Sequence, residues 1–270
     1  MRLFHADAFT DKVFKGNPAA VCLLSDGERL SDDDMQSFAA EFNLSETAFL
    51  SRTNNEIHLR WFTPQVEVDL CGHATLASAH VLWESGFVKR GATIEFRTKS
   101  GVLSAYEKAG RVVIDLPAKP TQDVEPPNDL LESLGVRGAV YIGRSQFDFL
   151  IEIDSVKTLK AMWPNMSKLE RLPGRGLIIT ARSDDAEYDF VSRFFSPQIG
   201  VDEDPVTGSA HCVLAPYWAK KLNKTTFTAL QASKRGGVLY IDLRDSRVLL
   251  SGSVVTVYSA EIPTRFLTEF

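Results

Sequence analysis

The sequence predicts a mixed α/β protein of two similar domains, each a mostly antiparallel sheet with one helix near its middle. Three observations support this prediction: a length of 270 residues with 44% hydrophobic content, short strand-like runs in both halves, and a motif that occurs twice. A chain of this size can bury two ordinary cores, and domains of about 120 to 150 residues are the natural expectation.

The first half is expected to hold six strands and two helices. Runs rich in β-branched and aromatic residues and bounded by Gly, Asn, Asp or Pro are typical of strands. These runs cover residues 13–24, 47–52, 57–62, 93–97, 102–106 and 111–116. Helices are expected over residues 32–42, with Ser31 as the N-cap, and over residues 74–84.

A proline-rich stretch separates the halves. Residues 117–128 contain four prolines and few large apolar residues, which is typical of a linker. The predicted domains are therefore residues 1–117 and 128–270. The second half should hold a helix over residues 209–222 and strands over residues 140–143, 147–153, 176–182, 188–195, 225–232, 237–243, 248–251 and 254–258. The sequence leaves open whether the last strand, 254–262, packs on the first domain.

A repeat relates the two halves. Residues 61–69 resemble residues 194–202 position by position, and three extra residues then enter the second copy. Beyond them, residues 71–74 (Cys-Gly-His-Ala) stand opposite residues 207–210 (Thr-Gly-Ser-Ala). The match predicts two lobes about a pseudo-two-fold axis with a cleft between them, where small ligands usually bind.

Each copy places a glycine turn directly before an Ala-rich helix, at Gly72 and at Gly208. The first turn of a helix leaves about four N–H groups unpaired and carries partial positive charge, so a glycine lets an anion approach closely. These turns are predicted to bind a carboxylate or to stabilise a developing enolate. The alternative is that both are simply central core helices.

The copies differ at residues that could do chemistry. Cys71 is matched by Thr207, and His73 by Ser209. A racemase with one thiol on each face of a carbon needs a cysteine at both helix starts, so two-thiol chemistry is disfavoured. Cys71 is interpreted as a small buried residue rather than a nucleophile. His73 is either a core histidine or a ligand contact.

Glu46 is the candidate acid/base. It stands at the entrance to the apolar run 47–52, where an isolated carboxylate is costly unless it faces a polar cleft or finds a partner. Burial would raise its pKa toward neutrality, which suits a group that takes a proton and returns it. In the competing interpretation Glu46 caps the helix 32–42 or pairs with Arg52.

Asp204 ends an acidic cluster, residues 202–204, in front of Pro205. Such a cluster near a helix start is ordinarily a solvated turn that complements the helix dipole. In the functional interpretation Asp204, held by Pro205 and close to the turn 207–209, hydrogen-bonds a substrate hydroxyl or amine.

Composition excludes several classes of function. A net charge of −5 and a pI near 5.6 disfavour nucleic acid and anionic membrane as partners. The start of the chain has no secretory signal pattern, and the three cysteines form no C-x-x-C pair, so reduced thiols in the cytoplasm fit best. No histidine shows metal-ligand spacing and no Gly-rich phosphate loop occurs, so neither a metal nor a nucleotide cofactor is expected.

At these residues the sequence resembles the phenazine-biosynthesis PhzF-like isomerase family, which shares the diaminopimelate epimerase fold with proline racemase. The likeness spans nearly the whole chain. Four motifs carry it in order: DAFT with FKGNPAAV (7–10, 14–21), NLSETAF (43–49), RWFTP with DLCGHAT (60–64, 69–75), and GVDEDPVTGSAH (200–211).

The resemblance implies two domains, each an antiparallel barrel-like sheet around a central helix, and a homodimer that needs no metal or cofactor. It implies that Glu46 shuttles the proton. It further implies that the substrate, a small carboxylate, contacts Gly72, His73, Asp204 and Ser209, near Gly208.

Three functions follow from the sequence. The leading one is an isomerase in which Glu46, as a single base, moves a proton on one face of a small cyclic carboxylate. The second is a two-base racemase or epimerase that uses Cys71. The third is a non-catalytic partner-binding protein with the same fold.

Overall fold

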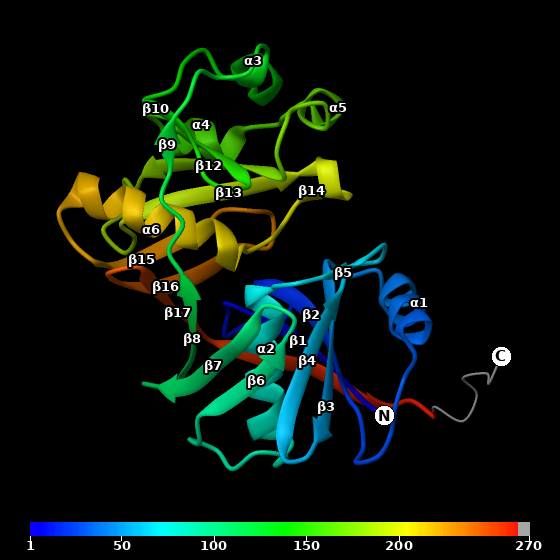
Figure 1. Ribbon diagram of the computed structural model, residues 1–270. Coiled ribbons are helices and arrows are strands. Elements are labelled where there is room, and N and C mark those ends of the chain that lie inside the picture. Colours follow the sequence, from blue (N-terminus) through cyan, green and yellow to red (C-terminus); the bar gives the residue numbers. More distant parts are fainter. Residues whose placement is uncertain (264–270) are drawn as a thin grey trace. The chain divides into compact units, whose positions relative to one another are not determined.

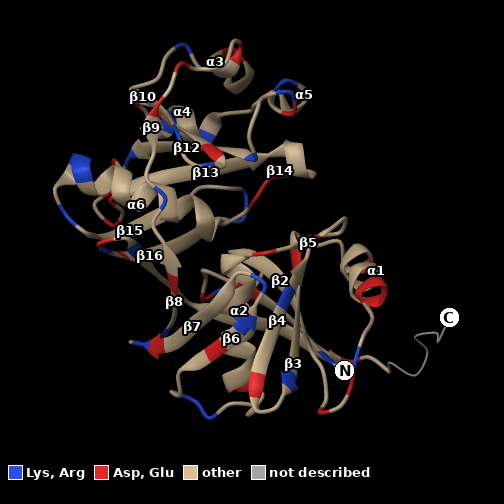
Figure 2. Ribbon diagram, viewed as in Figure 1, with Lys and Arg blue, Asp and Glu red and all other residues tan. Residues whose placement is uncertain are grey.

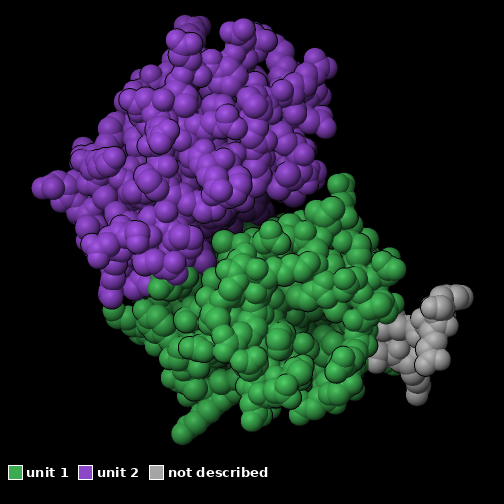
Figure 3. Space-filling model, in the orientation of Figure 1, with its two compact units in different colours: residues 1–115, 251–270 green, residues 116–250 purple. Residues whose placement is uncertain are grey.

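The computed structural model describes residues 1–263 and divides into two compact units (Figures 1 and 3). Unit 1 comprises residues 1–115 together with the chain from Ser251, and unit 2 comprises residues 116–250. Both are mixed α/β units. The last strand, whose place the sequence left open, lies in unit 1.

In unit 1, strands pack around the helix α2 (Gly72–Glu84). Every residue of α2 except His80 and Glu84 is buried, and its many small side chains let the strands approach closely. The other elements are β1 (Arg2–Ala8), β2 (Asn17–Leu23), α1 (Asp32–Phe42), β3 (Glu46–Thr53), β4 (Glu56–Phe62), β5 (Glu67–Val68), β6 (Ile94–Thr98), β7 (Gly101–Lys108), β8 (Arg111–Pro117) and β18 (Val254–Glu261).

The strand β1 lies between β2 and β18 and pairs antiparallel with both. The register runs from Arg2 opposite Glu261 to Ala8 opposite Val254. The strand β2 also pairs with β3, in parallel, with Ala19 opposite Glu46. Parallel pairing needs a crossover, which α1 supplies, and it brings Glu46 back to the end of the sheet where β2 begins.

Unit 2 contains the second long buried helix, α6 (Gly208–Leu222). Its strands β11 and β12 are parallel, with Asp148 opposite Gly176. The elements are β9 (Gln122–Asp123), α3 (Leu130–Leu134), β10 (Tyr141–Arg144), β11 (Asp148–Glu152), α4 (Val156–Ala161), α5 (Met166–Leu169), β12 (Gly176–Arg182), β13 (Phe190–Ser196), the 3₁₀ helix η1 (Pro197–Ile199), β14 (Val201–Glu203), β15 (Thr226–Gln231), β16 (Gly237–Arg244) and β17 (Arg247–Gly252).

The expected elements are largely observed, with informative differences. The helix 32–42 is confirmed, and Ser31 forms a capping box with Asp34. The predicted strand 13–24 begins only at Asn17, because Phe14 and Gly16 both have positive φ angles. The segment 117–128 is not purely a linker, since β9 pairs with β10 within unit 2.

The repeat is real, but the sequence alignment misplaces its insertion. Arg60 makes a two-point ion pair with Glu67, and Arg193 makes the same pair with Glu203. Glu203 therefore corresponds to Glu67, whereas the alignment set Gly200 there. The extra residues enter earlier, in the turn made by η1 and the residues after it.

Charged residues of both signs are interleaved on the strands and loops of each unit (Figure 2). Among residues 1–263, no helix combines the length and the apolar character that crossing a bilayer requires.

Candidate active site

Glu46 is the first residue of β3, and its side chain is 21% exposed. Its Oε2 atom lies 3.6 Å from Nε2 of His73. Arg52, the alternative partner, donates to the carbonyl of Phe87 and stacks on that ring, so its guanidinium is engaged elsewhere. The α1 C-cap is Asn43, whose own N–H bonds to Ala39. Of Arg52, the C-terminus of α1 and His73, it is His73 that lies beside the Glu46 carboxylate.

His73 is the second residue of α2 and is buried. Its Nδ1 atom lies 3.1 Å from Nδ2 of Asn17, and Ser45 donates its hydroxyl to Oδ1 of the same amide at 3.2 Å. The Asn17 amide therefore contacts Nδ1, and the other ring nitrogen, Nε2, is the one that faces Glu46.

Burial lowers the pKa of His73 to about 3, although a hydrogen bond with the Pro18 backbone acts in the opposite direction. The imidazole is therefore neutral at physiological pH, and its contact with Glu46 is not an ion pair. The backbone at Gly16, directly before Asn17, accepts only glycine. Gly16 has a φ of +62°, and a Cβ atom there would lie 2.1 Å from the carbonyl oxygen of Ala8.

Cys71 is the N-cap of α2, and its Sγ atom lies 3.5 Å from Nδ1 of His73. It is buried, as the sequence predicted. One ligand atom each from Glu46, Cys71 and His73 fall within 4.8 Å of one another, a set of donor types that zinc accepts.

The two long helices start in the same way. Gly72 opens α2 and Gly208 opens α6, and neither N-cap side chain, Cys71 or Thr207, makes a capping hydrogen bond. The first-turn N–H groups are thus not satisfied by the caps. Each helix start has the features of an anion-binding turn within its own unit.

Asp204 is buried in unit 2, not part of a solvated turn. Its Oδ2 atom accepts the Thr207 hydroxyl at 2.5 Å, and its carbonyl oxygen accepts from Nε2 of Gln231 at 2.8 Å. Gln231 also accepts the N–H of Thr207 at 2.8 Å. This network rigidly positions the turn that precedes Gly208.

Ser209 is the second residue of α6 and contacts Arg175, which forms an ion pair with Asp148. The sequence pointed to neither of these two residues. Nη2 of Arg175 lies 3.0 Å from the Ser209 hydroxyl oxygen. Arg175 also grips the buried carboxylate of Asp148 with two bonds, of 2.9 and 2.5 Å. The only signal in the sequence is an arginine between two glycines, 174 and 176, which by itself is typical of a turn.

Comparison with known proteins agrees with this architecture. The family model described as "Phenazine biosynthesis-like protein" matches residues 6–260. The chain belongs to the phenazine biosynthesis-like family. An uncharacterized isomerase of Halalkalibacterium halodurans is 53% identical over 263 residues, covering 96% of this chain and 97% of the relative.

Solved structures of this phenazine biosynthesis-like family share the fold. The PhzF family protein of Enterococcus faecalis superposes with a TM-score of 0.91 at 39% identity, covering 97% of this chain and 98% of that one. A probable proline racemase of Agrobacterium radiobacter has a TM-score of 0.66 at 10% identity, covering 97% and 92% of the two chains, which shows a common fold only. This chain is therefore an isomerase of the PhzF type with an epimerase-like fold.

Within this PhzF-type enzyme, the predicted residues form two clusters. Unit 1 brings together Glu46, Gly72 and His73, and adds Cys71 and Asn17. Unit 2 places Asp204, Gly208 and Ser209 around the start of α6 and adds Arg175 and Asp148. Whether these residues act on a substrate stays a prediction.

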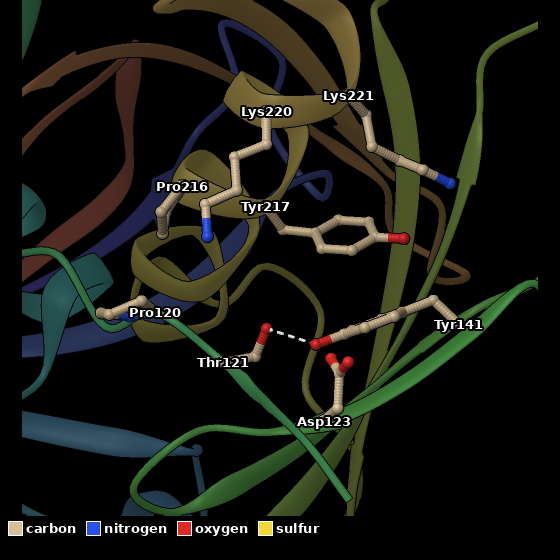
Figure 4. Close-up of a pocket in the computed structure, with 8 residues that line it drawn as sticks. All are labelled: Pro120, Thr121, Asp123, Tyr141, Pro216, Tyr217, Lys220 and Lys221. Carbon is tan, nitrogen blue, oxygen red and sulfur yellow. Dashed lines mark hydrogen bonds between the residues drawn. The ribbon is translucent and has the colours of Figure 1, made fainter.

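Unit 2 of the phenazine biosynthesis-like chain also has a separate hollow of about 180 Å³ beside the C-terminal half of α6 (Figure 4). The rings of Tyr141 and Tyr217 lie 4.8 Å apart in it. The Tyr217 hydroxyl donates to the buried Glu152, and burial followed by that carboxylate raises the pKa of Tyr217. The lining residues are Pro120, Thr121, Asp123, Tyr141, Pro216, Tyr217, Lys220 and Lys221, so no predicted site residue takes part.

Proposed function

We propose that this protein is a cofactor-independent isomerase that moves a proton on a small, cyclic carboxylate, with Glu46 as the single acid/base. Substrate binding is assigned to Gly72, His73, Asp204, Gly208 and Ser209. The proposal gives the family-level assignment, isomerase, a specific chemistry.

The Glu46–His73 contact supports the choice of base. The imidazole of His73 lies 3.6 Å from the Glu46 carboxylate and is neutral, so this contact places a polar group beside the proposed base without an ion pair. In the reaction, the C–H bond of the substrate breaks and its proton passes to Glu46. The electron pair moves into the conjugated carboxylate as an enolate. Glu46 then returns the proton to another carbon on the same face, so no oxidant or reductant is required.

The observation that carries the proposal is an asymmetry between the repeats. Glu46 pairs with Ala19 where β3 begins, and Gly176 occupies the matching position where β12 begins opposite Asp148. The next residues, Thr47 and Leu177, pair with the equivalent positions Phe62 and Phe195. One repeat therefore has a carboxylate at this position and the other has no side chain, which supports one-base chemistry.

The first turns of α2 and α6 support the proposed stabilisation of the enolate. An enolate that develops on a carboxylate substrate is stabilised by backbone N–H groups that are already oriented. The turns at Gly72 and Gly208 both have that form, because their N-cap side chains do not occupy the first-turn N–H groups.

Hydrogen exchange with solvent tests the proposal. Wild-type protein and Glu46→Gln are incubated in D₂O with a panel of small cyclic amino and hydroxy acids, and deuterium uptake is followed by NMR. The glutamine variant should lose exchange by about 10²- to 10⁴-fold and still bind ligand. Glu41→Gln, an exposed change on α1, is the control. An acid that exchanges equally well with Glu46→Gln would remove Glu46 from the mechanism.

The two-base racemase is the second candidate, because Sγ of Cys71 approaches Nδ1 of the same His73 ring. It predicts that Cys71→Ala is inactive. The one-base mechanism predicts that this variant keeps much of its exchange activity, since Cys71 is buried and its repeat counterpart is Thr207.

A further inference from the structure

The backbone of unit 2 leaves little freedom at Arg175. Gly174 has a φ of +105°, and a Cβ atom at Gly176 would lie 2.5 Å from the ring of Phe194. The N–H of Arg175 bonds to the carbonyl of Phe147 at 2.8 Å. Arg175 is therefore held between two positions that accept only glycine, and its side chain starts from a defined point.

Asp148 fixes the direction of that side chain. Its carboxylate is only 2% exposed and receives two parallel N–H bonds from the guanidinium. Such a fork-to-carboxylate pair has one preferred geometry. The Arg175 side chain is 31% exposed, so one edge of the guanidinium is anchored in the interior while the side chain reaches solvent.

The contact with Ser209 has a chemical consequence. A guanidinium carries donors only, so the Ser209 oxygen must be the acceptor in the 3.0 Å bond with Nη2. The Ser209 hydroxyl proton is then available for an acceptor elsewhere, and the adjacent cation makes it a stronger donor. Ser209 becomes a directed O–H donor in the first turn of α6.

A second cation, Lys119, lies beside the Phe147 ring that Arg175 also approaches. Nζ of Lys119 is 4.6 Å from the ring centroid of Phe147, and the Arg175 guanidinium carbon is 5.9 Å from that centroid. Burial first, and then the charge of Arg175, lower the pKa of Lys119. The charge of Arg175 adds to the effect of burial and Asp148 opposes it, so an anionic ligand beside the two cations would be favoured.

We propose that Arg175 is a specificity-determining residue: by holding Ser209 as a donor and adding positive charge at the start of α6, it makes this turn select a carboxylate over a neutral group. The inference rests on the proposed function in taking a carboxylate as substrate. The inference goes beyond the proposed function by assigning the preference for a carboxylate to Arg175 of unit 2.

Binding of matched acids and amides tests the proposal. The probes are benzoate, 2-furoate and cyclohex-1-ene-1-carboxylate, each with its carboxamide, and dissociation constants are measured on the full chain by ligand-observed NMR. Wild-type protein should bind at least one acid about tenfold more tightly than its amide. Arg175→Gln should reduce that ratio to near one, and Arg175→Lys, which keeps the charge but not the fork, should restore part of it.

The controls separate charge from folding. Arg182→Gln removes an exposed arginine at the far end of β12, the strand that begins directly after Arg175, and should leave the ratio unchanged. Arg175→Gln leaves the buried Asp148 carboxylate without its arginine and so could disturb folding. The double variant Asp148→Asn/Arg175→Gln removes both charges, and it should fold while losing the preference. Glu46→Gln should keep the preference even if the acid/base assignment fails. Either Arg175 variant keeping the wild-type ratio, or a wild-type protein that prefers no acid, would overturn the proposal.

Discussion

The backbone N–H of Lys119 donates to the carbonyl oxygen of Cys212 over 2.9 Å. Inside α6 that carbonyl would ordinarily accept from the residue four positions later, but this residue is Pro216, which has no N–H. The segment that follows β8 supplies the missing donor. Pro216 therefore leaves a carbonyl of α6 open to the Lys119 N–H, and this bond holds Lys119 in unit 2, where its side chain contacts Phe147.

Replacing this proline should free the Lys119 amide. In Pro216→Ala the new N–H competes for the Cys212 carbonyl, so the Lys119 amide is expected to exchange with D₂O at least about tenfold faster than in the wild type. Amide exchange followed by ¹⁵N NMR measures this. Pro173→Ala, an exposed loop change, is the control. Unchanged protection of the Lys119 amide would show that other contacts hold the segment after β8 against α6.

His73 should remain neutral well below neutral pH. Burial lowers its pKa to about 3, so the ring carries one proton throughout the neutral range. In ¹⁵N spectra the two ring nitrogens should stay distinct, one protonated and one not, down to about pH 4.5. A ring that is doubly protonated at pH 6 would contradict the prediction.

His211 should make the protein less stable in acid. It is buried, its Nδ1–H donates to the carbonyl of Thr207 at 2.8 Å, and burial lowers its pKa from 6.5 to about 4. Between these values the unfolded chain binds a proton that the folded chain does not, so the free energy of unfolding falls as pH drops, by on the order of 3 kcal/mol for this group. Above pH 6.5 the contribution is constant.

Urea unfolding at pH 7.5 and 4.5 measures that effect. The variant His211→Gln should lose less stability between the two pH values than the wild type does. Some dependence should persist, because His73 titrates in the same direction. An equal loss in variant and wild type would mean that His211 is not the group responsible.

Local signals explain what the sequence could predict. The capping pattern at Ser31, the glycines before both buried helices and the apolar run after Glu46 each act over a few residues, and the corresponding elements are observed. The likeness between the two units followed from the repeated motif. These features need no knowledge of which strands pair.

Features set by strand pairing could not be found this way. Arg175 meets Asp148 from 27 positions away, through the parallel register of β11 and β12, and meets Ser209 from 34 positions away, where α6 begins. The Asn17–His73 bond spans 56 positions. The insertion in the repeat was misplaced for the same reason, because ungapped similarity outweighed the Arg193–Glu203 pairing, which only the sheet reveals.

Gly176→Ala tests whether packing keeps β12 free of a side chain at the position that Glu46 holds in the other repeat. The new Cβ atom would lie 2.5 Å from Cζ of Phe194 and 2.9 Å from the carbonyl oxygen of Phe195. The contact with the backbone carbonyl of Phe195 cannot relax cheaply, and the buried Phe194 ring would also have to move, so the free energy of unfolding should fall by about 1–3 kcal/mol. Gly138→Ala, with no other atom within 4 Å, should change it by less than about 0.5 kcal/mol. If Gly176→Ala is as mild as the control, β12 could accept a side chain, and the lack of a second base would reflect chemistry rather than space.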